Sequence, residues 1–300
     1  MTDFFSFPFS AMGTECVLHF YAQRSAVTED VAQAVMAEVS RIEQRYSRFR
    51  PDSFLSEINR VAEQGGMLDV DEETAGLLNY AYACHEKSAG LFDISAGNLY
   101  QAWDFSVNRL PGQDQIDALL PLVGLQKILW TAPRLQFPLP GMKLDFGGIG
   151  KEYAADRVAD VCVNNGISSG LIDLGGDLRI IGPHPDGSPW RIGIRDPAQP
   201  ETALAVVDVR EGAMASSGDY ERYIEVAGKR YGHILNPTSG WPVQGLSSVS
   251  VIAPTCLVAG SISTMAILKG RDAPAWLEGL GISHGWVDDT GQRGGNLFSA

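Results

Sequence analysis

Residues 144–182 read LDFGGIGKEYAADRVADVCVNNGISSGLIDLGGDLRIIG. The first part predicts a strand end, a glycine loop and a helix over residues 144–166. The second part predicts two short strands over residues 169–182, joined by a turn at Gly175 and Gly176. This stretch therefore indicates a protein that combines helices with β-sheet.

The rest of the chain changes character along its length. Near the start, Val31, Val35, Val39 and Ile42 have the spacing of one helix face, whereas later segments alternate between apolar and polar residues. We expect helices at 28–49, 53–63, 71–90 and within 253–270, strands at 13–22, 190–197, 203–218, 223–235 and 247–254, and a short helix with an edge hairpin within 107–143. Helices followed by meandering strands indicate an α+β protein with mostly antiparallel sheets. We expect a single domain over residues 1–300, or two intimately packed subdomains.

Composition excludes two classes of partner. With 300 residues and 45% hydrophobic side chains the chain can bury a large core. A formal charge of −13 with scattered lysines and arginines argues against nucleic acids and anionic membrane surfaces. The longest apolar tract, residues 249–268, is interrupted by Pro254 and several hydroxyl residues, so we expect no membrane span.

Cysteine use and the N-terminus indicate the compartment. The cysteines form no CxxC or Cys/His pattern, which argues against zinc and favours buried, reduced thiols. Pro8 and Ser10 interrupt the apolar N-terminal stretch, which has no positive start, so we expect no signal peptide and a cytoplasmic location. A periplasmic protein trimmed of its leader would read the same. The cysteines are Cys16, Cys84, Cys162 and Cys256.

The glycine loop is a candidate phosphate site. Gly147 and Gly148 allow backbone N–H groups to approach an anion, the following helix adds partial positive charge, and Lys151 supplies a full one. A tight turn with an exposed lysine explains the segment equally well, and the spacing matches neither a Walker loop nor GxGxxG. The Gly175–Gly176 pair by itself favours a bulge or hairpin.

His233 is a candidate acid or base. It lies in residues 215–243, ASSGDYERYIEVAGKRYGHILNPTSGWPV, next to a turn that contains Pro237 and Gly240. A lone histidine is more often structural than catalytic, so both interpretations stay open for His233. Hydrolysis by a Ser-His-Asp triad is poorly supported because the chain has no GxSxG nucleophile elbow.

A third candidate site lies in residues 253–270, APTCLVAGSISTMAILKG. Ser261, Ser263 and Thr264 stand near the start of the expected helix, with no acidic residue among them. The hydroxyls could cap the helix, line an anion site, or belong to a metal site that lacks its carboxylate. Gly260 and Thr264 share one helix face.

Taken together, these segments resemble the ApbE family of FAD:protein FMN transferases, in the family's order and over most of the chain. The resemblance implies a T-fold-like α+β fold, FAD and magnesium, and transfer of FMN to a Thr or Ser hydroxyl of a target flavoprotein with release of AMP. The matching segments are AMGTECVL (11–18), YSRFRPDSFLSEIN (46–59), FDISAGNLYQAWDF (92–105), LDFGGIGKEYAADRVAD (144–160), LIDLGGDLRIIG (171–182), WRIGIRDP (190–197), SSGDYERY (216–223), GKRYGHILNPTSGWPV (228–243) and VSVIAPTCLVAGSISTMAILKG (249–270).

The resemblance also implies roles for individual residues. His233 matches the position of a catalytic base. The metal ligands would be the Gly148 carbonyl and the Thr264 hydroxyl. From the residues themselves, Ser261, Ser263 and the pyrophosphate are further oxygens that could hold the ion weakly. The family's metal-binding aspartate, four residues before that threonine, is replaced by Gly260. The implied cofactor contacts are Met12, Leu91, Phe92, Asp93, Asp145, Lys151 and Ile234.

The function expected from this resemblance is FMN transfer from FAD, impaired because the magnesium site keeps only neutral oxygens. Two alternatives are an FAD-binding protein without transferase activity and an FAD pyrophosphatase. On the same reasoning, Gly260→Asp is expected to tighten magnesium binding and to speed transfer.

Overall fold

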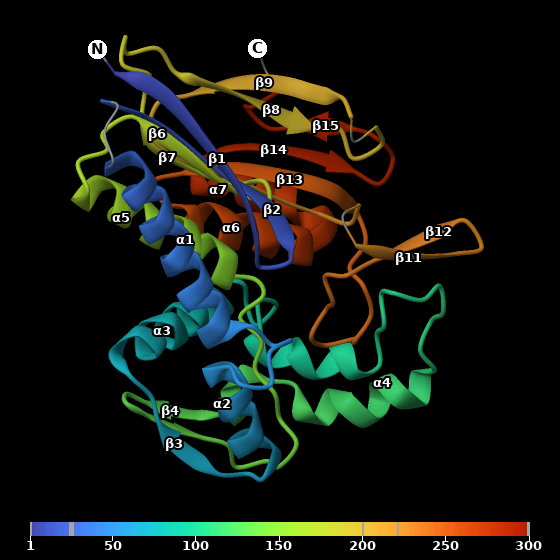
Figure 1. Cartoon of the computed structure of the whole chain (residues 1–300). Helices are drawn as coiled ribbons and strands as arrows, with labels where there is room; N and C mark the ends of the chain where they lie inside the picture. The colour runs from blue at the N-terminus through green and yellow to red at the C-terminus, as the bar shows by residue number, and fades with distance from the viewer. Residues whose placement is uncertain (1, 24–26, 200, 221, 299–300) are drawn as a thin grey trace.

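The computed structural model describes residues 2–23, 27–199, 201–220 and 222–298. Its centre is an antiparallel sheet of eight strands in the order β1-β2-β6-β7-β10-β13-β14-β15 (Figure 1). The strands are β1 (Asp3–Ala11), β2 (Thr14–Ala22), β6 (Gly170–Leu174), β7 (Asp177–Gly182), β10 (Gly212–Gly218), β13 (Leu246–Ala253), β14 (Ser283–Asp288) and β15 (Arg293–Gly294).

Helices cover one face of this sheet. They are α1 (Val27–Tyr46), α5 (Gly150–Asn164), α6 (Cys256–Lys269) and α7 (Ala273–Leu280). The apolar face of α1 enters the core as its spacing predicts, because Val35, Val39 and Ile42 are fully buried. The hairpin of β8 (Trp190–Arg195) and β9 (Ala203–Val209) lies on the opposite side, where Ile192 and Ile194 pack against strands β6, β7 and β10 (Figure 1).

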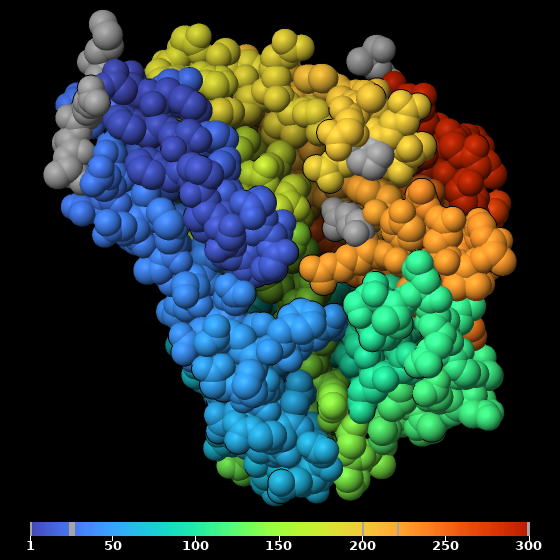
Figure 2. Space-filling model, turned by 45° about the vertical axis from the view of Figure 1, so that its right-hand side comes forward, coloured from blue at the N-terminus to red at the C-terminus, as the bar shows by residue number. Residues whose placement is uncertain are grey.

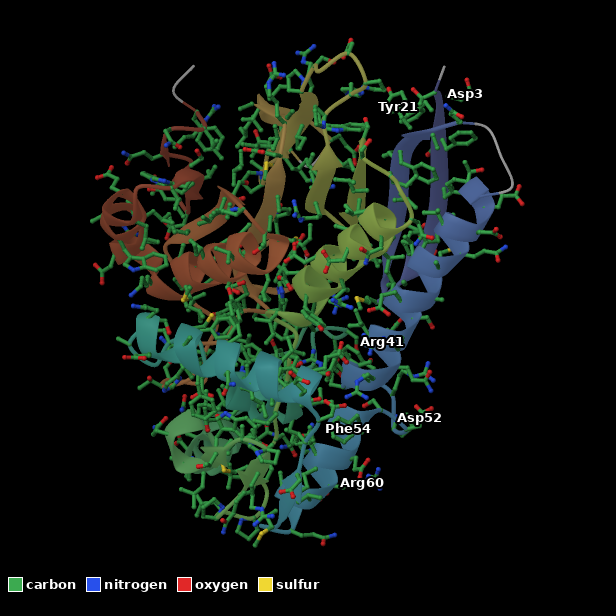
Figure 3. The ribbon with its side chains drawn as sticks, turned by 90° about the vertical axis from the view of Figure 1, so that its left-hand side faces the viewer. Asp3, Tyr21, Arg41, Asp52, Phe54 and Arg60 are labelled. Atoms are coloured by element: carbon green, nitrogen blue, oxygen red, sulfur yellow. The ribbon has the colours of Figure 1, made fainter. Side chains whose placement is uncertain are left out.

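A second group of elements lies at the lower end of the helical layer. It contains α2 (Phe54–Glu63), α3 (Glu72–Lys87) and a small sheet in the order β3-β5-β4 (Met67–Asp69, Arg134–Gln136 and Leu129–Thr131). Arg41 of α1 joins the two groups, because it binds Glu73 of α3 at 2.7 Å. Figure 3 shows Arg41 on α1 above Phe54 and Arg60 of α2.

A third group of elements lies beside the cavity that is described below. A small core that includes Trp103, Ile116 and Leu235 holds it together. Its elements are η1 (Ile94–Gln101), α4 (Gln113–Leu119), η2 (Leu120–Leu122), η3 (Leu125–Lys127) and the hairpin of β11 (Tyr223–Val226) and β12 (Lys229–Gly232).

The α+β class with mostly antiparallel sheet is confirmed. One detail of the sequence prediction is wrong, because residues 144–146 are not a strand end but lie in an extended loop. A further helix, α7, follows the helix within 253–270 and was not expected. Strand β1 was not foreseen because Pro8 interrupts it; as the first strand of the sheet it pairs only with β2, where proline is tolerated. None of the described helices is long and apolar enough to cross a membrane.

Candidate active site

A cavity of about 1200 Å³ opens between the β1–β2 hairpin, the N-terminus of α5, η1 and residues 216–235. Figure 2 shows this hollow between the N-terminal strands and the orange residues of the later strands. Its volume is sufficient for a dinucleotide-sized ligand. The cavity gathers most of the residues singled out in the sequence.

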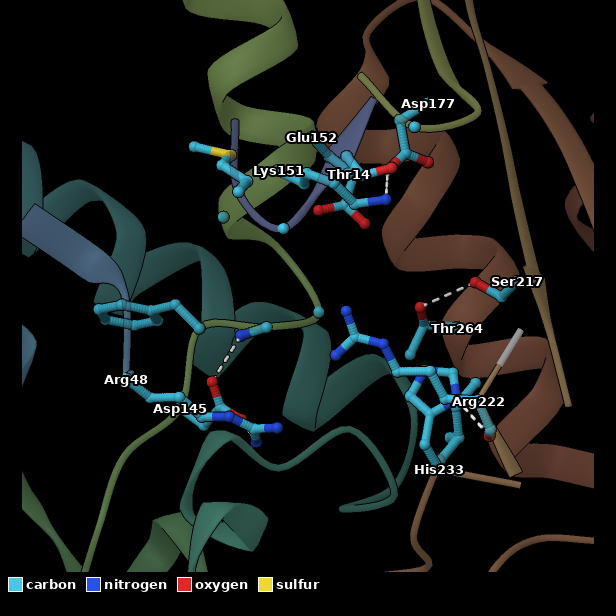
Figure 4. A pocket seen from close by; sticks show the side chains of 18 of the residues that line it. Thr14, Arg48, Asp145, Lys151, Glu152, Asp177, Ser217, Arg222, His233 and Thr264 are labelled. Atoms are coloured by element: carbon cyan, nitrogen blue, oxygen red, sulfur yellow. Dashed lines mark hydrogen bonds and ion pairs between the residues drawn. The ribbon is translucent and has the colours of Figure 1, made fainter. Parts of the chain in front are cut away.

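The glycine loop and Lys151 form one wall. The Lys151 ammonium lies 2.7 Å from Asp177 Oδ2, at the start of β7 (Figure 4). Burial raises the pKa of Asp177, and the nearby lysine opposes this rise. Lys151 thus has a protein carboxylate as a partner, and any phosphate at this wall would compete with Asp177 for its charge.

Asp145 lies on the opposite wall with two partners. Its Oδ1 accepts a hydrogen bond from Gly147 N at 2.9 Å, and its Oδ2 binds Arg48 at 2.5 Å. The Arg48 guanidinium lies 3.9 Å from the centre of the Tyr100 ring. Asp145 and Tyr100 together fix the direction of this cation at the cavity.

Residues 91–93 reach the cavity, but the Asp93 carboxylate accepts hydrogen bonds from other protein groups. Its oxygens accept hydrogen bonds from Ser95 N and Leu125 N, both at 2.8 Å, and from Ser95 Oγ at 2.6 Å. The Phe92 ring lies against Gly148, where an added Cβ would be 3.2 Å away. Asp93 therefore shapes the loop, while Leu91 and Phe92 offer apolar surface.

Met12 lies at the tip of the β1–β2 hairpin and also lines the cavity. Met12 and Gly13 form the two-residue turn between the paired Ala11 and Thr14, with φ of 53° and 74°. A methionine in this left-handed region is strained by roughly 1–2 kcal/mol relative to the usual region. Such strain is often retained at functional sites.

His233 and Ile234 follow β12 and line the same cavity. The His233 Nδ1 lies 3.3 Å from the Arg222 carbonyl oxygen. A carbonyl can only accept, so Nδ1 carries the proton and Nε2 is the nitrogen that can receive one. Burial lowers the pKa of His233 to about 4, and the charges of Arg222, Arg48 and Lys151 act in the same direction.

The predicted metal residues are only partly brought together. A Cβ on Gly148 would lie 3.9 Å from Thr264 Cγ2, so these two positions are neighbours. Thr264 Oγ1 lies 3.1 Å from Ser217 Oγ of β10 (Figure 4). Ser263, in contrast, is fully buried, bonds to Ser217 and to the Gly260 carbonyl, and is not among the described residues that line the cavity. The structure places Ser263 behind the wall.

Gly260 does not face an empty space. The carboxyl group of Glu152, on α5, lies against it: a Cβ on Gly260 would be 2.4 Å from Glu152 Cγ and 2.7 Å from Oε1. A carboxyl group that the sequence interpretation did not foresee therefore lies beside Gly260, while the expectation that a metal site here keeps only neutral oxygens stays a prediction. Burial raises the pKa of Glu152 to about 8, and the negative charge of Asp177 adds to the rise.

The described residues contain no group of three or more His, Cys, Asp or Glu side chains placed to hold a metal ion. Any cation at this site would have to use mixed ligands, such as one carboxylate, a hydroxyl, a backbone carbonyl and phosphate oxygens. Magnesium is commonly bound in this way.

Sequence reasoning did not single out Arg48, Tyr100, Asp177 or Ser217, although all four line the cavity. Each lies inside a segment that had been recognised as similar to the family. The sequence contains no signal of which distant side chains become neighbours at the cavity.

The fold and the cavity together define an α+β protein with a mostly antiparallel sheet and a large cavity lined by Arg48, Lys151 and Arg222. The family model for the ApbE family matches residues 12–284, and the chain belongs to that family. The Escherichia coli (strain K12) protein named FAD:protein FMN transferase is 33% identical over 261 residues, which cover 84% of this chain and 73% of that protein.

Solved structures agree with the family. The crystal structure of the ApbE protein from Thermotoga maritima superposes with a TM-score of 0.89 at 30% identity, covering 98% of this chain and 97% of that one. The apo form of the Pseudomonas stutzeri flavinyl transferase ApbE gives 0.88 at 29% identity, covering 100% and 98%. These likenesses confirm the resemblance found in the sequence.

Proposed function

We propose that the protein binds FAD in the main cavity and transfers its FMN part to a Thr or Ser hydroxyl of a target flavoprotein, releasing AMP. The observation that carries this proposal is the position of His233 at the cavity, with Nδ1 directed at the Arg222 carbonyl and Nε2 left to accept a proton. The names of the relatives support the same reaction.

At phosphorus the reaction makes one bond and breaks one, and a proton moves from the acceptor to the histidine. The acceptor oxygen attacks the FMN-side phosphorus of FAD, its proton passes to His233 Nε2, and the bond from that phosphorus to the oxygen of AMP breaks. A histidine with a low pKa is neutral at physiological pH and so is in the form that can take the proton. AMP leaves with the bridging oxygen.

The cations of the cavity would position the pyrophosphate. Arg48 and Arg222 line the cavity together with Lys151. Phosphoryl transfer depends mainly on positioning and on neutralising charge, which are the tasks that fixed guanidinium groups perform. Met12, Leu91, Phe92 and Ile234 would contact the less charged parts of FAD.

We propose that magnesium binds at the oxygen-rich wall. The Gly148 carbonyl and the Thr264 hydroxyl are the oxygens proposed to hold it, and a bound ion would neutralise charge on the pyrophosphate. Ser263 is proposed to act indirectly, by orienting Ser217 beside Thr264.

The test is co-expression with a flavoprotein that bears an acceptor threonine, followed by intact-mass measurement. A covalent FMN adduct, together with AMP release that depends on the acceptor, is expected. AMP release without an acceptor would instead indicate the pyrophosphatase, and FAD binding without AMP release would indicate the binding protein.

A further inference from the structure

Glu152 occupies the space that a side chain at position 260 would need. It lies in the first turn of α5, and its Cγ, Oε1 and Cδ are 2.4, 2.7 and 2.9 Å from the position of a Cβ on Gly260. Real Cβ atoms do not approach other atoms this closely, so any side chain at 260 would require the buried Glu152 side chain to shift. Glycine at 260 is what makes room for this glutamate.

Hydrogen bonds near Glu152 fix the position of α6 relative to α5. Asp156, one turn after Glu152, accepts hydrogen bonds from Cys256 N at 2.8 Å and Leu257 N at 2.9 Å at the start of α6. These charge-assisted bonds hold the N-terminus of α6 against α5. The contact between residues 152 and 260 is therefore part of a rigid junction.

One oxygen of Glu152 lacks a partner. The residue is 6% exposed and lines the main cavity, yet its buried Oε2 makes no hydrogen bond within the described residues. A buried polar atom without a partner is costly, commonly by about 1–3 kcal/mol. At a cavity wall such an atom can take a bound ion or a water as its partner.

The surroundings of this oxygen favour a cation. Figure 4 shows Glu152 beside Asp177 and Lys151, above Thr264. Gly260, which Glu152 touches, is one helical turn before Thr264, and Thr264 neighbours Gly148. A carboxylate, a hydroxyl and a backbone carbonyl thus lie on one continuous wall.

We infer that Glu152 supplies the acidic ligand of the divalent cation, from α5, in place of a carboxylate on α6. The inference rests on the proposed function only for the phosphate groups that would complete the ion's coordination. The competing interpretation is that Glu152 is a neutral acid that only fills space between the helices.

The decisive measurement is magnesium affinity by isothermal titration calorimetry, for the protein alone and for the protein with ADP as a pyrophosphate carrier. Glu152→Gln keeps the shape of the side chain and removes its charge. We expect it to weaken magnesium binding by at least roughly tenfold, the loss that even outer partners of a metal can cause. Glu43→Gln, which removes an acid from α1 at the same cavity, is the matched control and should keep the affinity.

A second set of variants moves the acidic side chain from position 152 on α5 to position 260 on α6. Gly260→Asp alone should give no gain in magnesium affinity and should lower the melting temperature, because Glu152 occupies the space. The double variant Glu152→Gly, Gly260→Asp should restore the melting temperature and should bind magnesium about as tightly as the unchanged protein.

The outcomes separate the two proposals. Unchanged magnesium affinity in Glu152→Gln would overturn the inference, and so would an equal loss in Glu43→Gln. FAD binding in EDTA, followed by flavin fluorescence, tests the proposed function independently of the ion. If FAD does not bind there, the proposed function fails, and the titration without nucleotide still decides the role of Glu152.

Discussion

The Tyr100 hydroxyl donates a hydrogen bond of 2.9 Å to the backbone carbonyl of His233. Burial raises the pKa of Tyr100 to about 12, so the phenol remains a donor throughout the physiological range. This bond ties η1 to the loop that carries the proposed base. The same ring lies under the Arg48 guanidinium, so one tyrosine positions both an acid–base group and a cation.

We expect Tyr100→Phe to lower stability by about 1 kcal/mol, the usual value of one hydrogen bond, and to lower kcat more than it raises KM for FAD. Urea denaturation and steady-state kinetics would measure the two effects. Tyr82→Phe is the control, because its hydroxyl also bonds to backbone carbonyls, those of Leu125 and Ile128. It should lose similar stability and no kcat; an equal kcat loss in both variants would argue against a positioning role for Tyr100.

His233→Ala should reduce transfer roughly 10²- to 10⁴-fold while leaving FAD affinity nearly unchanged, as expected for a general base. Single-turnover AMP release gives the rate, and flavin fluorescence in EDTA gives the affinity. Parallel losses of rate and affinity would assign His233 to the structure of the loop instead.

The rate of transfer should not fall near neutral pH through protonation of His233. Since burial lowers the pKa of His233 to about 4, the neutral base form persists as the pH falls until that value is approached. We expect a nearly constant rate between about pH 5.5 and pH 7.5, where an ordinary histidine with a pKa of about 6.5 would lose activity. A clear fall in kcat centred near the ordinary value would contradict this.

Lys151→Ala should destabilise the fold, because it leaves the buried Asp177 carboxylate without its cation. The expected loss is about 1.5–3 kcal/mol in urea denaturation, typical of a hydrogen bond to a charged group. Adding Asp177→Asn should recover part of it. If Lys151 also binds phosphate, the affinity for FAD stays reduced in the double variant. Full recovery of the affinity would mean that Lys151 only pairs with Asp177 and does not contact FAD.

Two helix glycines should respond oppositely to alanine. Gly76→Ala in α3 should stabilise by about 0.5–1 kcal/mol, since the new methyl meets no described atom within 4 Å. Gly260→Ala should destabilise by about 1–3 kcal/mol through overpacking against Glu152. Thermal denaturation of both variants decides the point; stabilisation by Gly260→Ala would show that Glu152 moves away freely.

The sequence predicted much of the fold and less of the site. Most of the long helices and the β-meander follow from local periodicity. Residues 27–46 show this well, because the spacing of their apolar residues defines the face that packs into the core. The sequence could not decide whether the partner of Lys151 is a phosphate or a protein carboxylate, since Asp177 reaches it only in the folded chain. For the same reason nothing in the local pattern links Gly260 to Glu152, because the two meet only in the folded chain.

The two edges of the large sheet differ from its interior strands. At one edge β1 carries Pro8, which has no N–H to offer to another strand, and at the other β15 is only two residues long. The nine-residue row of backbone groups on β1 is interrupted at Pro8, and the row on β15 is short. Edge-to-edge polymerisation of neighbouring molecules is thereby disfavoured, and a protein that must hold a wide cavity open beside its sheet is protected from aggregating through that sheet.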